Sequence, residues 1–258
     1  IASALGRHAT DIKTLETHKA FRFVMACAAR QKERLKCGFD LVIDSEFSHA
    51  VGLGSSAAVT VAMNAALAAW LGSPASPRAL FDVSRAVIRE VQGLGSGADV
   101  AASVYGGMVA YRADPVEIEP LQAVHPVTVI FSGSKKPTVE VVQWVEARRQ
   151  AHPVLYDGIF RLMDQSVGEA IQAIRGGDWK TLGALMNINQ GLMDALGVSA
   201  ANLSEIAYAL RQEPDILGSK ISGSGLGDCV IGLGPSTRTD WPCEALPVEI
   251  TATGARIE

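Results

Sequence analysis

The run Gly52-Leu53-Gly54-Ser55-Ser56-Ala57 places two glycines and two hydroxyls directly before a long apolar stretch. Glycine lets a backbone approach a ligand closely, and the free N–H groups at a helix N-terminus favour a bound phosphate. The run therefore predicts a site for a phosphorylated ligand. It is equally typical of an ordinary helix start with a serine as its N-cap, so by itself it leaves both interpretations open.

Two further glycine clusters follow, Val91–Ala102 and Lys220–Cys229. The chain has no G-x-x-x-x-G-K-[ST] motif and no G-x-G-x-x-G between a strand and a helix, so its motifs indicate neither a P-loop ATPase nor a dinucleotide-binding enzyme. In this order the three clusters resemble the motifs of the GHMP superfamily, the small-molecule kinases named for galactokinase, homoserine kinase, mevalonate kinase and phosphomevalonate kinase. The resemblance runs from about Gly38 to Gly234.

The fold that this resemblance implies is α+β with two domains. An N-terminal ATP-binding domain of the ribosomal-protein-S5-domain-2-like type is expected over residues 1–122, and a ferredoxin-like C-terminal domain over residues 123–258. The mixture of helical and strand patterns independently favours α+β. We interpret Pro115–Pro126, which three prolines interrupt, as the crossing between the two halves.

The elements that must position the clusters follow from hydrophobic periodicity. Helices are predicted over residues 18–36, 55–71, 78–91, 138–150, 155–175, 180–196 and 203–212, with a short one from Asp99, and strands over 39–45, 107–112, 127–132, 229–233 and 248–251. The apolar helix after Ser56 contains Thr60 and Asn64, so we interpret it as a buried core helix and not as a membrane span.

Transfer of a phosphoryl group requires neutralised phosphate charge, a bridging metal ion and an oriented acceptor hydroxyl. The resemblance implies that ATP and Mg²⁺ bind here. The ATP-binding residues would be Gly52, Leu53, Gly54, Ser55, Ser56 and Ala57, together with Gly223, Ser224 and Gly225 of the third cluster. The alternative for the third cluster is a plain glycine hairpin between two strands.

Asp99 is the residue that we expect to act as the catalytic base, because the resemblance assigns proton acceptance to the aspartate that ends this glycine turn. The alternative is an ordinary N-cap of the helix that follows. Ser56 and Glu90 are the expected Mg²⁺ ligands, since a hydroxyl and a carboxylate suit its preference for oxygen. For Glu90 the alternative is an exposed side chain on a helix surface.

The stretch Leu185–Ser199 and the run Val91-Gln92-Gly93 resemble the mevalonate kinase branch, whereas Gly97–Gly107 and Gly227-Asp228-Cys229 resemble phosphomevalonate kinases. We therefore expect a mevalonate kinase-like enzyme. The alternatives are a phosphomevalonate or sugar kinase of the same superfamily, and a non-catalytic nucleotide-binding member.

Two departures bear on the acceptor. Family members often have glycine where Leu226 and Asp228 stand. The lysine that mevalonate kinases place near their N-terminus is not recognisable in Ile1–Lys19, so this segment is either missing or dispensable.

Composition limits the remaining classes of function. A hydrophobic content of 48% with 19% charged residues indicates a globular chain, and the net charge of −4 provides no basic surface for nucleic acid. The four cysteines, Cys27, Cys37, Cys229 and Cys243, show no metal-binding spacing. We expect a cytoplasmic enzyme with a small-molecule substrate and no nucleic-acid or membrane partner, and a homodimer is left open.

Overall fold

The computed structural model describes residues 1–45 and 52–258, and it divides them into two compact units. The first unit contains residues 1–45, 54–122 and 251–258, and the second contains residues 52–53 and 123–250. The glycine run is therefore divided between them after Leu53. The units also differ from the expected domains in the last segment, 251–258, which packs with the first unit.

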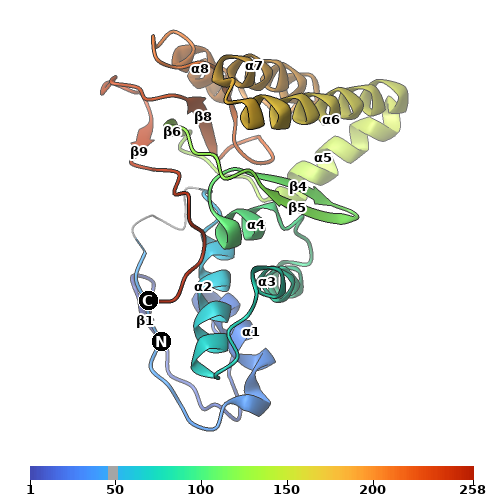
Figure 1. Ribbon diagram of the computed structural model, residues 1–258. Coiled ribbons are helices and arrows are strands. Elements are labelled where there is room, and N and C mark those ends of the chain that lie inside the picture. The colour runs from blue at the N-terminus through green and yellow to red at the C-terminus, as the bar shows by residue number, and fades with distance from the viewer. Residues whose placement is uncertain (46–51) are drawn as a thin grey trace. The chain divides into compact units, whose positions relative to one another are not determined.

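The first unit is mainly helical (Figure 1). Its helices are α1 (Arg22–Arg30), α2 (Ser55–Trp70), α3 (Pro77–Gln92) and α4 (Ala98–Tyr105), and two short 3₁₀ helices, Lys19–Phe21 and Lys32–Arg34, flank α1. Its strands are β1 (Ala2–Ser3), β2 (Gly6–Arg7) and β3 (Val42–Ile43) in one small sheet, and β4 (Val109–Ala113) and β5 (Val116–Pro120) in an antiparallel hairpin.

Helix α2 is the central element of this unit, because it packs against α1, α3 and α4. Its core face includes polar groups that fix it in place. The side chain of Asn64, which is 4% exposed, donates to Ser84 Oγ of α3 at 3.1 Å. Fully buried Thr60 donates to the carbonyl oxygen of Ser56 at 2.6 Å. These bonds hold the first turn of α2 in a defined position, and they confirm the prediction of a buried core helix.

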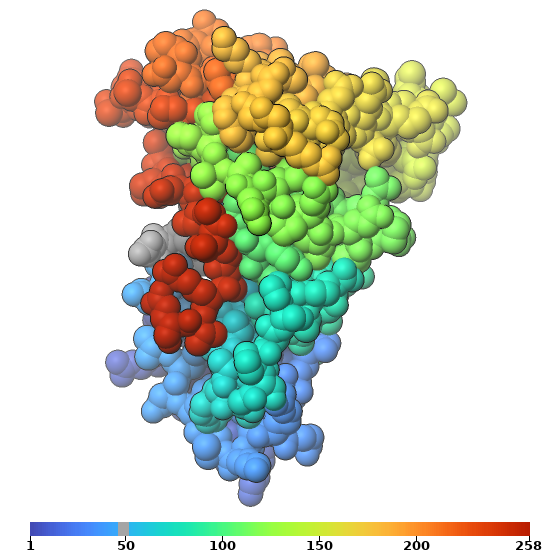
Figure 2. All heavy atoms as spheres, in the orientation of Figure 1, coloured from blue at the N-terminus to red at the C-terminus, as the bar shows by residue number. Residues whose placement is uncertain are grey.

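The last residues of the chain lie along α4 (Figures 1 and 2). The amide of Gly107 donates to the carbonyl oxygen of Thr251 at 2.7 Å, and the amide of Ala255 donates to that of Ser103 at 2.9 Å. Gly254 approaches α4 so closely that a Cβ on it would stand 2.1 Å from the carbonyl oxygen of Val104. Residues 251–258 thus pack as part of the first unit.

The second unit is built on a four-stranded antiparallel sheet with the order β7-β8-β6-β9. Its strands are β6 (Val127–Phe131), β7 (Ser219–Ile221), β8 (Cys229–Leu233) and β9 (Glu244–Leu246), and its helices are α5 (Thr138–Ala151), α6 (Pro153–Gly176), α7 (Trp179–Ala195) and α8 (Ala201–Leu210). Helices α6 and α7 run side by side (Figure 1). Ile130, Leu203 and Val230 are fully buried between the sheet and the helices.

Helix α7 approaches the edge strand β7 unusually closely, through two glycines. A Cβ on Gly183 would stand 2.3 Å from the carbonyl oxygen of Leu217, and a Cβ on Gly218 would stand 2.0 Å from that of Gly183. Only glycine fits at either position, and this contact sets how α7 lies along the strand.

The α+β prediction is confirmed, and most predicted helices match within a few residues. Three predictions were wrong. Residues 116–120, interpreted as part of a crossing, form β5, because Val116 and Ile118 alternate with glutamates while Pro115 occupies the turn. Residues 248–251 form no strand, since the fourth strand of the sheet is β9. The helix predicted over 18–36 is regular only over Arg22–Arg30.

None of the helices in the described ranges is long and apolar enough to cross a membrane. Cys27 and Cys229 are fully buried, and burial raises the pKa of each thiol to about 12. Cys229 is a core residue of β8.

Candidate active site

The N-terminus of α2 provides the first half of the candidate site. Its N-cap is Gly54 in the left-handed conformation, with φ of 74°, and no side chain caps the helix. The N-cap interpretation of the two serines is therefore wrong. Ser55 and Ser56 are the first two helical residues, and both amides and both hydroxyls lie within the first turn, where an anion is favoured.

Ala57 has a different position from the serines. Its amide donates to the carbonyl oxygen of Gly54 at 2.9 Å, as does that of Ala58 at 3.0 Å. These bonds use the two amides within the helix. Ser55 and Ser56 are the first two residues of α2, where backbone amides have no acceptor within the helix, so this helix end can direct their N–H groups to a ligand.

Asp99 lies next to this helix end. A Cβ on Gly54 would stand 3.4 Å from Asp99 Cβ, 3.5 Å from its Cγ and 3.8 Å from its Oδ2. Asp99 is exposed, in the first turn of α4, and the N-cap of α4 is Gly97. The prediction that Asp99 acts only as a helix cap is therefore wrong. The second glycine cluster delivers a carboxylate to the start of α2.

The turn that carries Asp99 is held by the β4–β5 hairpin. The hydroxyl of Tyr111 in β4 donates to the carbonyl oxygen of Ser96. Gly97 has φ of 101°, and a Cβ there would stand 2.8 Å from Tyr111 Oη and 3.0 Å from Arg85 Cδ. Arg85 in turn donates to the carbonyl oxygen of Ala113 at 3.1 Å. The glycine at position 97 is thus required by the close packing of the turn.

Glu90, a predicted magnesium ligand, lies near the end of α3 and is engaged by a cation. Its Oε2 accepts from Arg30 Nη2 at 2.7 Å and from Arg30 Nε at 3.1 Å. The two side chains are 54% and 38% exposed, so solvent screens the pair. A metal ion shared by Glu90 and Ser56 remains a prediction.

The second unit has a glycine-rich segment of its own, the third glycine loop, Ser222–Asp228. Gly223 and Gly225 have φ of 73° and 87°, but Leu226 and Asp228 also adopt left-handed φ values of 57° and 65°. These are the two positions where family members often have glycine, so the backbone keeps a glycine-like path although the side chains differ. Such conformations cost energy and persist where the surroundings hold them.

Asp228 packs against the start of the glycine run in the same unit. A Cβ on Gly52 would stand 2.4 Å from Asp228 Oδ1, and one on Gly223 would stand 3.6 Å from its Oδ2. Lys135 Nζ lies 4.0 Å from Asp228 Oδ1. The carboxylate thus lies between the backbones of the first and third glycine loops. Asp228 is the one acidic residue of the third glycine cluster, and this could have marked it as a candidate site residue. Neither Asp228 nor Lys135 was predicted to have a role from the sequence.

The fit of these residues to a nucleotide can be tested on their polar atoms. The Oγ atom of Ser224 is buried and finds no hydrogen-bond partner among the described residues. A buried orphan hydroxyl is one that a ligand or a water would satisfy. Within the second unit, this hydroxyl lies between Gly223 and Gly225 of the third loop, and such a donor suits a phosphate oxygen.

The fit to a metal ion is less complete. Within the described residues, no group of three or more His, Cys, Asp and Glu side chains could hold a metal ion. Mg²⁺ in kinases is held by few protein oxygens, with the nucleotide phosphates completing its shell. The hydroxyl of Ser56 and a carboxylate fit that pattern.

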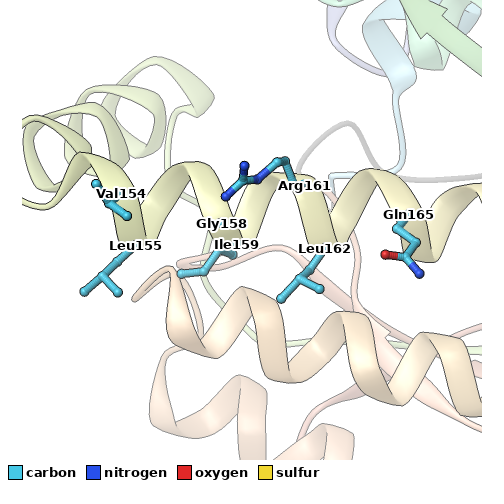
Figure 3. A pocket seen from close by; sticks show the side chains of 7 residues that line it. All are labelled: Val154, Leu155, Gly158, Ile159, Arg161, Leu162 and Gln165. Carbon is cyan, nitrogen blue, oxygen red and sulfur yellow. The ribbon is translucent and has the colours of Figure 1, made fainter.

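A shallow groove on α6 has a different character (Figure 3). Leu155, Ile159 and Leu162 project from one side of this helix, and Arg161 from another. The lining residues include none of the predicted site residues. The groove is therefore not the candidate site.

Comparison with known proteins agrees with this geometry. Residues 20–107 match the GHMP kinases N terminal domain, and residues 170–240 match the GHMP kinases C terminal domain. The chain is 36% identical over 227 residues to a mevalonate kinase of Thermococcus sibiricus, covering 86% of this chain and 66% of that protein. It is 34% identical over 233 residues to a mevalonate kinase of Pyrococcus furiosus, covering 88% and 69%. The chain thus spans about two thirds of the length of these relatives.

A solved structure extends the likeness to three dimensions. The crystal structure of L. major mevalonate kinase in complex with R-mevalonate superposes with a TM-score of 0.73 at 26% identity, covering 84% of this chain and 68% of that one. The fold prediction of a GHMP-kinase-like arrangement is confirmed. The chain belongs to the GHMP kinase family of ATP-dependent small-molecule kinases, and within that family it resembles the mevalonate kinases.

Proposed function

We propose that the protein transfers the γ-phosphoryl group of ATP to a hydroxyl of mevalonate. The relatives at 34–36% identity support this acceptor, because they are mevalonate kinases, and the L. major mevalonate kinase was crystallised in complex with R-mevalonate. Since the chain spans 66–69% of the first relatives, the proposal concerns the activity of the whole protein. The observation that carries it is the Asp99 carboxylate beside Gly54, the N-cap of α2.

The phosphates of ATP would be bound from several glycine-rich segments. The amides and hydroxyls of Ser55 and Ser56 are the donors at the α2 end, and Gly52, Leu53 and Gly54 let the backbone approach. Gly223, Ser224 and Gly225 would add the contacts of the third loop. Ser56 and Glu90 would hold Mg²⁺, which neutralises phosphate charge when bound.

Asp99 would act on the acceptor. It accepts the proton of the mevalonate hydroxyl as that oxygen bonds to the γ-phosphorus, and the bond from the γ-phosphorus to the oxygen that links it to the β-phosphate breaks. ADP leaves with that oxygen, and Asp99 later releases its proton to solvent. Position contributes more to this role than basicity does, and the closeness of Asp99 to Gly54, the N-cap of α2, supports the proposal.

An acceptor panel tests the proposal. The protein is incubated with Mg·ATP and with mevalonate, phosphomevalonate or galactose, and both ADP and the phosphorylated product are followed. We expect turnover with mevalonate above the other two. Turnover only with phosphomevalonate or galactose would replace the acceptor. ATP binding without turnover on any acceptor would favour a non-catalytic member of the family.

Two further properties are proposed, and a third is left open. We infer that the enzyme needs Mg²⁺ and that it is cytoplasmic, whereas the sequence leaves open whether it forms a homodimer. Their support is the likeness to a family of metabolic kinases. Omitting Mg²⁺ from the acceptor assay tests the first, and sedimentation velocity tests the third.

A further inference from the structure

Gln190 of α7 makes hydrogen bonds in two directions from a buried position. Its side chain is 5% exposed. Its Oε1 accepts from the amide of Ile221 at 2.8 Å, and its Nε2 donates to Ser199 Oγ at 3.0 Å. Ser199 Oγ lies 2.8 Å from Ser204 Oγ, so the network continues into α8. One side-chain amide thus joins β7 to the connection between α7 and α8.

Both partners of Gln190 lead directly to the third glycine loop, Ser222–Asp228. Ile221 is the last residue of β7 and immediately precedes that loop. On the other side, the residue before Ser199 is Val198, whose carbonyl oxygen accepts from the amide of Leu226 at 2.7 Å. The entry to the loop and its middle are therefore both anchored to the structure around Gln190.

The contact with Val198 is close as well as hydrogen-bonded. A Cβ on Gly225 would stand 2.4 Å from the carbonyl oxygen of Val198 and 2.8 Å from its Cβ. Val198 itself is 1% exposed. The following residue, Leu226, has φ of 57° and so occupies a conformation that needs support from its surroundings. The Val198 segment supplies that support, and Gln190 fixes the segment.

Asn187 provides a comparison within the same helix. It lies three residues before Gln190, on the same face of α7, and its Oδ1 accepts from the amide of Ser219 at 2.9 Å. This bond also satisfies an amide of β7, but Ser219 is the first residue of the strand and lies at the end away from the loop. The side chains of Asn187 and Gln190 both end in an amide group. Gln190 is bonded to Ile221 before the loop and to Ser199 beside the Val198 contact, whereas Asn187 is bonded to Ser219.

We propose that Gln190 is a positioning residue for the third glycine loop, and that it sets the affinity of this loop for the phosphates of a nucleotide. The second clause rests on the proposed function. The role requires an acceptor for Ile221 and a donor for Ser199 at opposite ends of one planar group. An amide supplies both, and an aliphatic side chain of similar size supplies neither.

The test compares Gln190→Leu with Asn187→Leu in the full chain. Amide hydrogen exchange of residues 222–228 is measured first, because it reports on the loop whatever the enzyme does. We expect Gln190→Leu to speed this exchange by about tenfold, as for the loss of one buried anchor. Asn187→Leu should change exchange near Ser219 and leave the loop within twofold of the parent. Equal exchange of the loop in both variants would overturn the inference.

Nucleotide affinity is the second readout. Calorimetric binding of the non-hydrolysable analogue AMPPNP with Mg²⁺ should weaken by about tenfold in Gln190→Leu and by less than twofold in Asn187→Leu. Faster loop exchange with unchanged AMPPNP affinity would overturn the inference, since the loop would then have no part in phosphate binding.

Ser199→Ala covers the case in which Gln190→Leu does not fold. It removes the hydroxyl that joins Gln190 to the Val198 segment and keeps the bond to Ile221. Exchange at Leu226 should rise, whereas exchange at Ile221 should not, and the reverse pattern would contradict the proposal. If the parent protein shows no turnover on mevalonate, the proposed function is wrong. The hydrogen-exchange result would then still decide whether Gln190 positions the loop.

Discussion

The carboxylate of Asp99 lies against Gly54, the N-cap of helix α2. The position of a Cβ on Gly54 is 3.5 Å from Asp99 Cγ and 3.8 Å from Asp99 Oδ2. The N-terminus of α2, which favours phosphate, and the Asp99 carboxylate, which would accept a proton, are thus close neighbours in the first unit. They come from two glycine clusters that are about 40 residues apart in the sequence.

Gly54→Ala should lower kcat by more than the loss of folded protein can explain. The left-handed φ of 74° costs a non-glycine residue about 1–2 kcal/mol, and a shift of the backbone that relieves this strain would move the new methyl group, which is in van der Waals contact with Asp99, against that side chain. We expect kcat to fall by roughly 10- to 100-fold, because small displacements of a catalytic group are costly. Steady-state kinetics and urea unfolding are measured together.

Gly72→Ala is the matched control for that variant. Gly72 has a similar φ of 68°, and a Cβ there would meet nothing within 4 Å. It should lose a similar amount of stability and keep its kcat. If both variants lose turnover equally, backbone strain and not the Asp99 contact explains the effect.

Glu90→Gln tests the predicted magnesium ligand. If Glu90 leaves Arg30 to help bind the metal ion, the Mg²⁺ concentration for half-maximal rate should rise by about tenfold or more. Stability should change by less than about 1 kcal/mol, because the Arg30–Glu90 pair is exposed. Arg30→Gln is the companion variant and should leave the Mg²⁺ requirement unchanged or lower. An identical rise in both variants would mean that Glu90 serves only the ion pair.

The buried ammonium group of Lys220 should make the free energy of unfolding depend on pH. Burial lowers the pKa of its ammonium group from 10.5 to about 8, whereas the unfolded chain keeps the ordinary value. Between about pH 8 and 10.5 the unfolded state therefore binds more protons, and stability relative to a Lys220→Met variant rises with pH. Lys220→Met should be the more stable protein at pH 7, and the gap should narrow by roughly 1–3 kcal/mol on going to pH 10. Urea unfolding of both proteins across this range is the measurement, and a constant gap would contradict it.

Gly183→Ala should destabilise the second unit. The new Cβ would stand 2.3 Å from the carbonyl oxygen of Leu217, so α7 must move away from β7 at a cost of roughly 1–3 kcal/mol or more. Gly168→Ala in α6 is the control, because nothing lies within 4 Å of its Cβ position. That variant should gain about 0.5–1 kcal/mol from helix propensity. Equal effects on the urea unfolding curve would show that the close approach at Gly183 does not matter.

Local sequence was sufficient to predict the long helices, because the apolar stripe of α3 and the continuous apolar run of α2 are both local properties of the sequence. It failed where tertiary context decides. Residues 116–120 became β5 because β4 was available to pair with them. Residues 248–251 did not become a strand because the edge of β6 is already taken by β9.

The candidate site shows the same division. Glycine clusters and a following aspartate are visible in the sequence, so Gly54, Ser55, Ser56 and Asp99 could be proposed from it. That Asp228 lies against Gly52, or that Gln190 supports both sides of a loop 30 residues away, depends on packing between distant segments. No local pattern contains that information.

Asp99→Asn is the most direct test of the account. The carboxamide keeps the shape of the side chain beside Gly54 and removes the proton acceptor, with Asp164→Asn on the exposed face of α6 as a control. We expect kcat with mevalonate to fall by about 10²- to 10⁴-fold while the dissociation constant for ATP stays within a few-fold of the parent. A variant that keeps its kcat would contradict the assignment of Asp99 as the base, and with it the proposed site.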